Sequence, residues 1–217
     1  MLRRRFLTNI NLANKVPYNE IWYTTTDKKR LGNEEYYDFT AISSYAEDSG
    51  KLSFPYNITN IDNNMFRKCD TLVSITFPDS IMSIGSYVFH SCSKLANIDF
   101  GSAITSLGAE VFSACTSLTG IVIPDTVITM GNYVFLSCTN LKNVTLGKKV
   151  AKLGAGTFQG CTGVTSLYCR AELPPEIVST SLSGLPSSCK IYVPKSLVTS
   201  YKGLSYWNDY TIVGYDF

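Results

Sequence analysis

"VFHSCSKLANIDF", residues Val88–Phe100, decides the fold because its pattern occurs five times along the chain. A phenylalanine is followed three residues later by a cysteine, and then by apolar residues at fixed intervals. When the sequence is laid against itself with a shift of 23 residues, like residues fall into register without any insertion. The two most regular columns are Phe66, Phe89, Phe112, Phe135 and Phe158, and Cys69, Cys92, Cys115, Cys138 and Cys161. A fixed period of this length is typical of a solenoid, in which stacked coils share one continuous core.

The remaining columns give the path of the chain within one coil. The segment "LVSITFP", residues 72–78, alternates apolar and polar residues at its end and predicts a short strand. The next segment, "SIMSIG", predicts a second short extended piece on the opposite side of the coil, and Gly85 and its equivalents then turn the chain. After that turn, "SYVFHSC" predicts a short helical or irregular turn that places Phe89 and Cys92 in the interior.

The cysteine column has two interpretations. Equivalent residues of neighbouring coils would lie roughly 4.8 Å apart, which is close enough for a disulfide bond. However, stacked equivalent residues have parallel Cα–Cβ vectors, which suit a disulfide poorly, and five cysteines leave one without a partner. We therefore predict free thiols that act as small buried hydrophobic residues.

Both ends of the repeat predict capping segments, which a solenoid needs to cover its terminal coils. Residues 52–54 and 191–193 match the repeat strand, so we predict a sheet of seven parallel strands that ends at Val193. After it, "KSLVTSYKGLSYW" predicts a helix, and "TIVGY" predicts a strand. Before the repeat, "EIWYTTT" and "YYDFTAISSYA" predict strands, whereas Cys189 has no evident role. The residues expected on the inner face of the helix are Leu197, Tyr201, Leu204 and Trp207.

The segment "IPDTVITMGNYVFLSCTNLKNVTL", residues 123–146, resembles the BspA-type leucine-rich repeat. The features that carry the resemblance are an Ile-Pro-Asp strand end, a turn glycine, and Phe-x-x-Cys-x-x-Leu. The chain would then consist of an N-terminal segment with capping strands (1–51), five 23-residue repeats (52–170) and a C-terminal capping segment (171–217). The C-terminal segment is similar to the one that closes such arrays in gut Bacteroidales, and "MLRRRF" resembles chain openings in the same group.

The resemblance implies a mainly β fold, a right-handed leucine-rich-repeat solenoid with a parallel sheet and short helical turns. It also implies surface binding or adhesion, usually of protein or host ligands, by a repeat that carries no catalytic residues. It suggests a location at the cell surface or outside the cell. Because "FLTNINLANK" is too polar for the apolar region of a secretion signal, no such signal is visible in the sequence and the location stays open.

Composition argues against several classes of function. Charged residues make up 17% of the chain and the net charge is +2, so nothing favours a nucleic-acid partner. No stretch approaches the ~20 apolar residues of a membrane span, so we expect no membrane insertion. The single histidine, His90, shares its column with Arg67, Ser113, Leu136 and Gln159, which indicates an exposed turn. With one histidine and cysteines held in a core column, we expect no catalytic dyad, no metal site and no cofactor.

The outward positions of the predicted sheet are the candidate ligand-binding face. Such positions vary without disturbing the core of a solenoid, and its sheet presents an extended surface. Tyrosine supplies a large contact area at low entropic cost, so the two tyrosines at the C-terminal end are the expected anchors. The alternative is a solvated surface of small polar residues without a ligand. The predicted face consists of Ser74, Thr76, Asn97, Asp99, Val122, Asn143, Thr145, Ser166, Tyr168 and Tyr192.

Three functions follow from this pattern. The first is a monomeric, non-enzymatic binding module that presents the sheet face to a protein or a glycan. The second is a structural or assembly component, such as part of a virion or a surface complex, in which the solenoid is a scaffold. The third is an enzyme that uses carboxylates on the sheet, among which Asp99 would be the first candidate. A repeat fold does not by itself choose among them.

Overall fold

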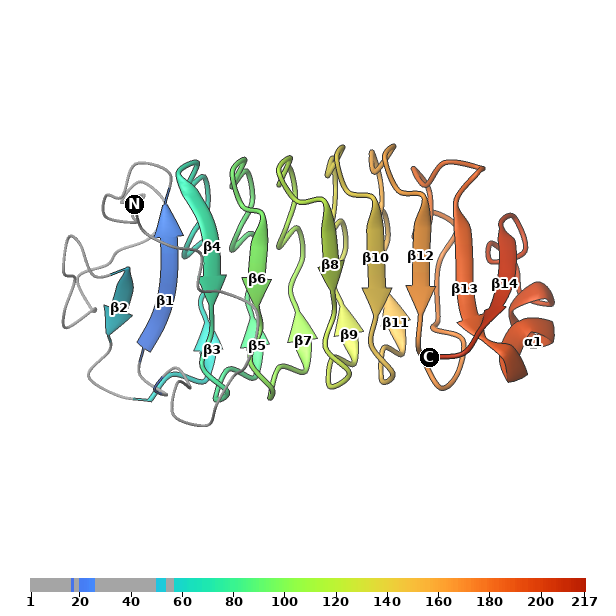
Figure 1. Cartoon of the computed structure of the whole chain (residues 1–217), viewed down its shortest axis with the longest axis horizontal. Coiled ribbons are helices and arrows are strands. Elements are labelled where there is room, and N and C mark those ends of the chain that lie inside the picture. Colours follow the sequence, from blue (N-terminus) through green and yellow to red (C-terminus); the bar gives the residue numbers. More distant parts are fainter. Residues whose placement is uncertain (1–16, 18–19, 26–49, 54–56) are drawn as a thin grey trace.

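The computed structural model describes residues 17, 20–25, 50–53 and 57–217. It is an elongated solenoid whose coils stack along one axis (Figure 1). The strand predicted at "YYDFTAISSYA" lies outside the described residues. Among those that are described, no helix is both long and apolar enough to cross a bilayer.

Each repeat contributes one strand to a front face and one two-residue strand to a back sheet, as the sequence predicts. Parallel pairing in the back sheet runs without a break from the first coil to the last. Its strands are β3 (Asn60–Ile61), β5 (Ser83–Ile84), β7 (Ser106–Leu107), β9 (Thr129–Met130) and β11 (Lys152–Leu153). The repeat strands of the front face are β4 (Leu72–Thr76), β6 (Asn97–Asp99), β8 (Gly120–Val122), β10 (Asn143–Leu146) and β12 (Ser166–Cys169).

The phenylalanine column forms a continuous stack in the core. Ring centroids of consecutive members lie 5.5 to 5.7 Å apart, and the planes of Phe89 and Phe112 differ by only 5°. All five rings are fully buried. The stack lies on the turn side of the coil, where backbone hydrogen bonds such as Phe89 N–H to the Val111 carbonyl join neighbouring coils at 2.9 Å. Packing and a second hydrogen-bonded ladder therefore hold the coils together here.

The cysteine column is buried beside this stack. All seven cysteines are free and buried, in agreement with the predicted free thiols. The Cys92 Sγ lies 2.9 Å from the Phe66 carbonyl oxygen, and the same contact recurs at Cys115, Cys138 and Cys161. These four thiols each donate to a carbonyl group of the preceding coil and need no disulfide partner. Cys189, for which the sequence predicted no role, is also fully buried.

The glycine column permits close approach between coils. A Cβ atom on Gly108 would lie 2.6 Å from the Gly85 carbonyl carbon, and one on Gly131 would lie 2.6 Å from that of Gly108. No side chain fits at these distances. The left-handed residues of the coil are elsewhere, in the turns, at positions such as Tyr87 (φ 62°) and Ser91 (φ 62°).

The N-terminal edge of the front face differs from the prediction. β1 (Glu20–Thr25) lies between β2 (Lys51–Ser53) and β4 and runs antiparallel to both. Residues 52–54 therefore do not begin a sheet of seven parallel strands. β1 occupies the edge of β4, and its buried Ile21 and Tyr23 side chains cover the apolar interior of the first coil. Both side chains belong to the same hydrophobic core as the repeat residues.

A second difference is a break between β6 and β8, which divides the front face into two sheets. In neighbouring coils, the Phe77 N–H donates to the Asp99 carbonyl at 2.9 Å and the Ile123 N–H donates to the Thr145 carbonyl at 2.8 Å. Within the described residues, the equivalent bond from Phe100 to Val122 is missing. We call this break the front seam.

Two local features lie at the front seam. Gly101 adopts a left-handed conformation (φ +66°), and its N–H donates to the Asp99 carboxylate at 3.1 Å, which turns the chain at the end of β6. Pro124 at the end of β8 has no N–H, whereas the equivalent Arg170 donates to the Leu146 carbonyl at 3.1 Å. The back sheet and the phenylalanine stack continue across the seam, so only the front face is open there.

At the C-terminal end, β13 (Lys190–Pro194) and β14 (Thr211–Tyr215) extend the front face, so the sheet continues beyond Val193. The predicted strand at "TIVGY" is confirmed as β14. The predicted helix is shorter than expected: a 3-10 turn (Lys195–Leu197) and α1 (Val198–Lys202) end at Gly203. Because the helix ends there, Leu204 is exposed, contrary to the prediction, whereas Tyr201 and Trp207 are buried with their rings 4.9 Å apart.

Candidate functional site

The predicted outward positions do line the front face, and the strand registers align them in two columns. Asn143 pairs with Gly120 and Ser166, and Thr145 pairs with Val122 and Tyr168. Asn97, Asp99, Val122 and Asn143 are exposed, and the other six predicted residues are half-buried. The front seam separates four of the ten predicted residues, which lie on β4 and β6, from the other six. The four are Ser74, Thr76, Asn97 and Asp99, and the six are Val122, Asn143, Thr145, Ser166, Tyr168 and Tyr192.

The N-terminal group offers less free polar surface than the sequence predicted. The Ser74 hydroxyl contacts the Thr24 hydroxyl of β1 at 2.6 Å, and one Asp99 carboxylate oxygen accepts the Gly101 N–H. Asp99 therefore has a structural role in ending β6.

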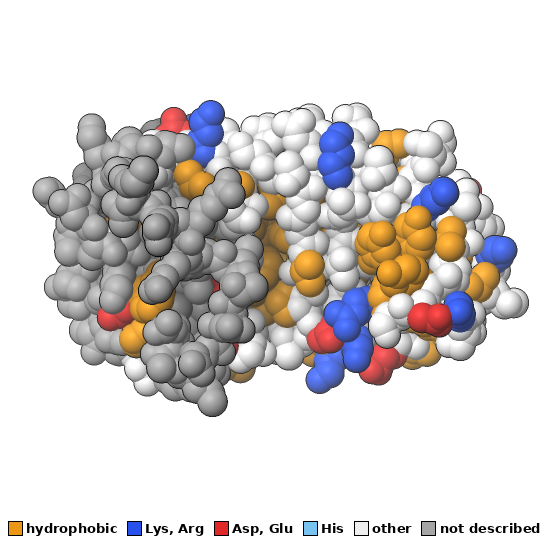
Figure 2. Space-filling view, viewed as in Figure 1, with side chains coloured by type: hydrophobic (Ala, Val, Ile, Leu, Met, Phe, Trp, Pro, Cys, Tyr) orange, Lys and Arg blue, Asp and Glu red, His pale blue; other side chains and the backbone are white. Residues whose placement is uncertain are grey.

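The C-terminal group contains an aromatic cluster, which we call the tyrosine cluster: Tyr168, Tyr192 and Tyr215. The Tyr168 and Tyr192 rings, in register on β12 and β13, stack with centroids 4.6 Å apart and planes 13° apart. Tyr215 packs edge to face against both, at 5.6 Å from Tyr168 and 5.7 Å from Tyr192. Phe217 extends the cluster at 5.0 Å from Tyr215. Hydrophobic side chains accordingly gather over this end of the front face (Figure 2).

The path of the last strand explains how three tyrosines meet. β14 pairs in parallel with β13, and the chain end after β14 runs back across the front face toward β12 (Figure 1). Tyr215 is 44% exposed and Phe217 is 48% exposed, so the cluster is stabilised by its own contacts yet open to solvent. The sequence identified Tyr168 and Tyr192 but not Tyr215 or Phe217. The predicted strand at "TIVGY" could have identified them if it had been predicted to pair with the front sheet.

Charged pairs flank the cluster. An Arg170 guanidinium nitrogen lies 3.2 Å from an Asp125 carboxylate oxygen, and Lys195 forms a hydrogen-bonded ion pair with Asp216. These pairs are half-exposed or exposed, so each contributes little to stability. They provide polar groups at the border of an apolar surface, an arrangement that is common in binding sites.

The single histidine is poorly placed for catalysis. His90 Nε2 lies 3.6 Å from a Glu110 carboxylate oxygen, and partial burial lowers the histidine pKa. Its column is less exposed than the sequence indicated, because Ser113 is buried and only Gln159 is fully exposed. Among the described residues, no group of three or more His, Cys, Asp or Glu side chains could hold a metal ion.

The cysteine thiols are equally unsuited to nucleophilic chemistry. Burial raises the pKa of Cys69 and of Cys161 to about 12, and it raises the pKa of Cys92, Cys115 and Cys138 well above the ordinary value. A thiol acts as a nucleophile only when it is ionised, so these thiols are inert at neutral pH.

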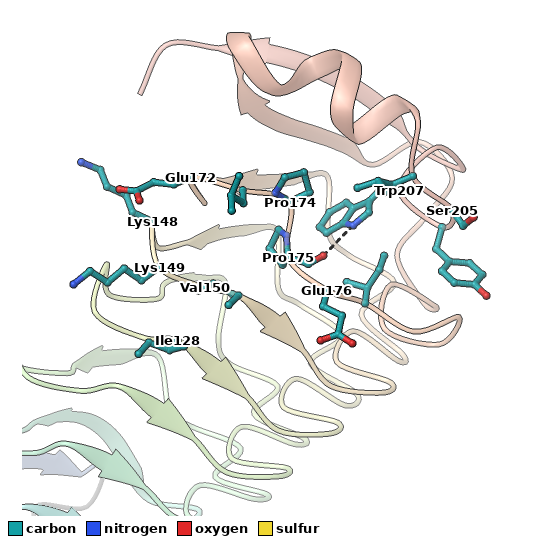
Figure 3. A pocket seen from close by; sticks show the side chains of 15 residues that line it. Ile128, Lys148, Lys149, Val150, Glu172, Pro174, Pro175, Glu176, Ser205 and Trp207 are labelled. Carbon is teal, nitrogen blue, oxygen red and sulfur yellow. Dashed lines mark hydrogen bonds between the residues drawn. The ribbon is translucent and has the colours of Figure 1, made fainter.

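A separate cleft of about 790 Å³ lies beyond β11, between residues 171–177 and the loop after α1 (Figure 3). The sequence analysis did not predict it, because residues that line it are far apart along the chain, from Ile128 to Trp207. Its walls are mostly apolar, and the Trp207 Nε1–H donates to the Pro175 carbonyl at 3.3 Å at its base. Lys148 and Lys149 lie at one end of the cleft, whereas Glu176 and Ser205 lie at the other (Figure 3).

Comparison with known proteins agrees with this geometry. A family model described as the BspA type leucine rich repeat region matches residues 40–165 with six copies. No curated protein sequence matches the chain. A solved structure of a leucine rich cell surface protein from Faecalibacterium prausnitzii is 32% identical, with a TM-score of 0.51. The match covers 54% of this chain and 31% of that one.

Two further solved structures share the fold. The Treponema pallidum (T. pallidum) leucine rich repeat protein is 26% identical with a TM-score of 0.53, over 70% of this chain and 79% of that one. The pneumococcal vaccine antigen PcpA is 18% identical with a TM-score of 0.61, over 74% of this chain and 42% of that one. The chain thus matches less than half of the Faecalibacterium and pneumococcal proteins. From the repeat columns, the stacked coils and the family match, the chain belongs to the BspA-type leucine-rich repeat family.

Proposed function

We propose that the chain is a non-enzymatic binding module that holds a protein or glycan ligand on its front face, with the tyrosine cluster as the anchor. The observation that carries the proposal is the cluster itself. Three tyrosine rings are in mutual contact, Tyr215 exposed and the other two half-buried, at the end of a surface made mostly of small polar residues. Clustered exposed aromatic rings supply binding energy in many interfaces, and here their positions are already fixed.

The surface beside the cluster supports a binding role. Thr145 lies in register beside Tyr168, Val122 lies beside Thr145, and Gly120 beside Asn143 has no side chain, so the side chains of β8 and β10 are smaller than that of Tyr168 on β12. A ligand that lies across the strands would contact the Tyr168 ring on β12 and polar side chains such as Asn143 on β10. The relatives described as a cell surface protein and a vaccine antigen support a role in contact with external molecules.

Binding arrays test the proposal. The wild-type chain is applied to an array of glycans and to an array of purified extracellular proteins, in parallel with a Tyr168→Ala/Tyr192→Ala variant. The matched control is Tyr133→Ala/Tyr206→Ala, which removes two exposed tyrosines that lie outside the cluster. All three proteins must first show the same circular dichroism spectrum.

We expect at least one ligand that binds the wild type and the control and is lost from the cluster variant. Equal binding by all three proteins would place the site elsewhere and contradict the proposal. Loss from the control alone would move the site to the turn side or to the cleft. Whether the ligand comes from the glycan or from the protein array decides between the two classes.

A further inference from the structure

From the cleft beyond β11 we infer a second binding site, for a small amphipathic anion that has an aliphatic body and one carboxylate or sulfate group. The site is separate from the front face, so the inference does not depend on the proposed function. Its volume of about 790 Å³ lies within the ~300–1,000 Å³ range of small-molecule sites.

The walls of the cleft match an aliphatic body. Several of its apolar side chains are unusually exposed, and Leu173 is 75% exposed. Apolar side chains gathered around a hollow are typical of ligand sites, whereas single exposed ones are ordinary. The apolar residues that line the cleft with substantial exposure are Ile128, Leu173, Leu204 and Tyr206.

The charges at one end match an anionic head group. Lys148 and Lys149 are consecutive and exposed, and neither forms an ion pair within the described part of the chain. Glu172 lies beside Lys148 (Figure 3), and the Lys148 N–H donates to the Asp125 carboxylate, which is paired with Arg170. The lining at this end therefore carries two lysines and one glutamate. Glu176, at the other end, is paired with Lys152 at 3.9 Å. The attraction for an anion is therefore confined to the end that holds Lys148 and Lys149.

The backbone around the cleft argues against an extended peptide as the ligand. An extended peptide that binds as an added β-strand forms main-chain hydrogen bonds with its site. Here Pro174 and Pro175 have no N–H groups, and the Pro175 carbonyl already accepts the Trp207 indole. The Glu176 N–H and carbonyl bond to Ala151 and Leu153 at 2.8 and 3.0 Å. The free backbone N–H and carbonyl groups that a peptide would need are scarce in this wall. A ligand without a peptide backbone does not need them.

Calorimetry with three defined compounds tests the inference on the full chain. The probes are decanoate below its micellar concentration, decyltrimethylammonium of equal chain length, and the acetylated peptide Leu-Leu-Glu-Leu-Leu. We expect decanoate to bind the wild type and the cation to bind much more weakly. The Lys148→Ala/Lys149→Ala variant should lose roughly tenfold in affinity for decanoate, as for loss of a charge-assisted contact.

Matched variants separate the site from general charge effects. The control Lys94→Ala/Lys142→Ala removes two exposed lysines outside the cleft and changes the net charge equally. It should bind decanoate like the wild type, whereas Glu172→Gln should bind decanoate more tightly because a repulsive charge is removed. Leu173→Ser should weaken binding of decanoate and leave the fold intact, because the side chain is already largely exposed.

Three results would overturn the inference: no decanoate binding by the wild type, equal losses in the two lysine variants, or tighter binding of the peptide than of decanoate. The Tyr168→Ala/Tyr192→Ala variant should bind decanoate normally. Failure of this inference is therefore distinguishable from failure of the proposed front-face function.

Discussion

Tyr168 and Tyr192 occupy equivalent positions on neighbouring parallel strands, and their rings stack 4.6 Å apart. Stacked aromatic pairs contribute about 0.5–1.5 kcal/mol beyond their burial. We therefore predict a coupling energy of about that size in a double-mutant cycle of Tyr168→Ala and Tyr192→Ala, measured by urea unfolding. A cycle between Tyr168 and the distant Tyr133 should give a coupling near zero. Equal values in the two cycles would mean that the stack does not form in solution.

The phenylalanine stack predicts a large stability effect. Phe112 packs between Phe89 at 5.5 Å and Phe135 at 5.7 Å and is fully buried. Replacing it with alanine leaves a cavity, and Phe112→Ala should lower the free energy of unfolding by about 3–5 kcal/mol. Tyr133→Ala, at a half-exposed position, should cost much less. A melting temperature of Phe112→Ala equal to that of the wild type would contradict the central place of this column.

Two glycines predict opposite effects of the same substitution. A Cβ atom on Gly108 would lie 2.6 Å from backbone atoms of the neighbouring coil, whereas one on Gly120 would find its nearest atom 3.6 Å away. Gly108→Ala should therefore destabilise the protein by about 1–3 kcal/mol or more through overpacking. Gly120→Ala should be neutral or stabilise it by about 0.5–1 kcal/mol, because glycine weakens a strand. Chemical denaturation of both variants checks the prediction, and the reverse order of stability would refute the close packing of coils.

The front seam predicts uneven hydrogen exchange. The Phe77 and Ile123 amides bond across neighbouring coils, and the Phe100 amide has no equivalent bond to Val122. Amides that lack a ladder bond exchange through small openings. We expect the Phe100 amide to exchange much faster than those of Phe77 and Ile123 under native conditions. Similar protection of all three amides, measured by NMR, would show that the front sheet is continuous in solution.

The buried thiols predict a loss of stability at high pH. Burial raises the pKa of Cys161 to about 12, against 9.0 for an ordinary thiol. Between these values the unfolded chain releases the proton and the folded chain keeps it, so the free energy of unfolding falls as pH rises. The contribution of this thiol is fully present below pH 9 and falls by about 1.4 kcal/mol per pH unit above it.

A comparison with Cys161→Ala isolates this effect from other groups that titrate at high pH. The stability of the wild type relative to the variant should be constant from pH 7 to 8.5 and should fall between pH 9 and 12. Urea unfolding at each pH measures it. A difference between the two proteins that does not change with pH would mean that the thiol is accessible to water.

The repeat made most of the fold predictable, because columns such as those of phenylalanine, cysteine and glycine indicate the same local structure in several coils. The ends of the solenoid were predicted only in part, because each end segment occurs once in the sequence. The antiparallel pairing of β1 with β4 depends on contacts such as that of Tyr23 with Ile75, which a repeat pattern does not predict. The front seam occurs once, between β6 and β8, so a pattern repeated in every coil could not predict it. The candidate face was found in part, and Tyr215 was missed because it comes from a strand outside the repeat.

Labelling of exposed tyrosines in the presence and absence of the array-selected ligand tests the central claim most directly. The native chain is iodinated under mild conditions, and the modified tyrosines are quantified by mass spectrometry. The account predicts that the ligand protects Tyr168, Tyr192 and Tyr215 and leaves Tyr133 and Tyr206 as reactive as before. Protection of Tyr133 or Tyr206, with the cluster still reactive, would show that the ligand binds elsewhere and would contradict the account.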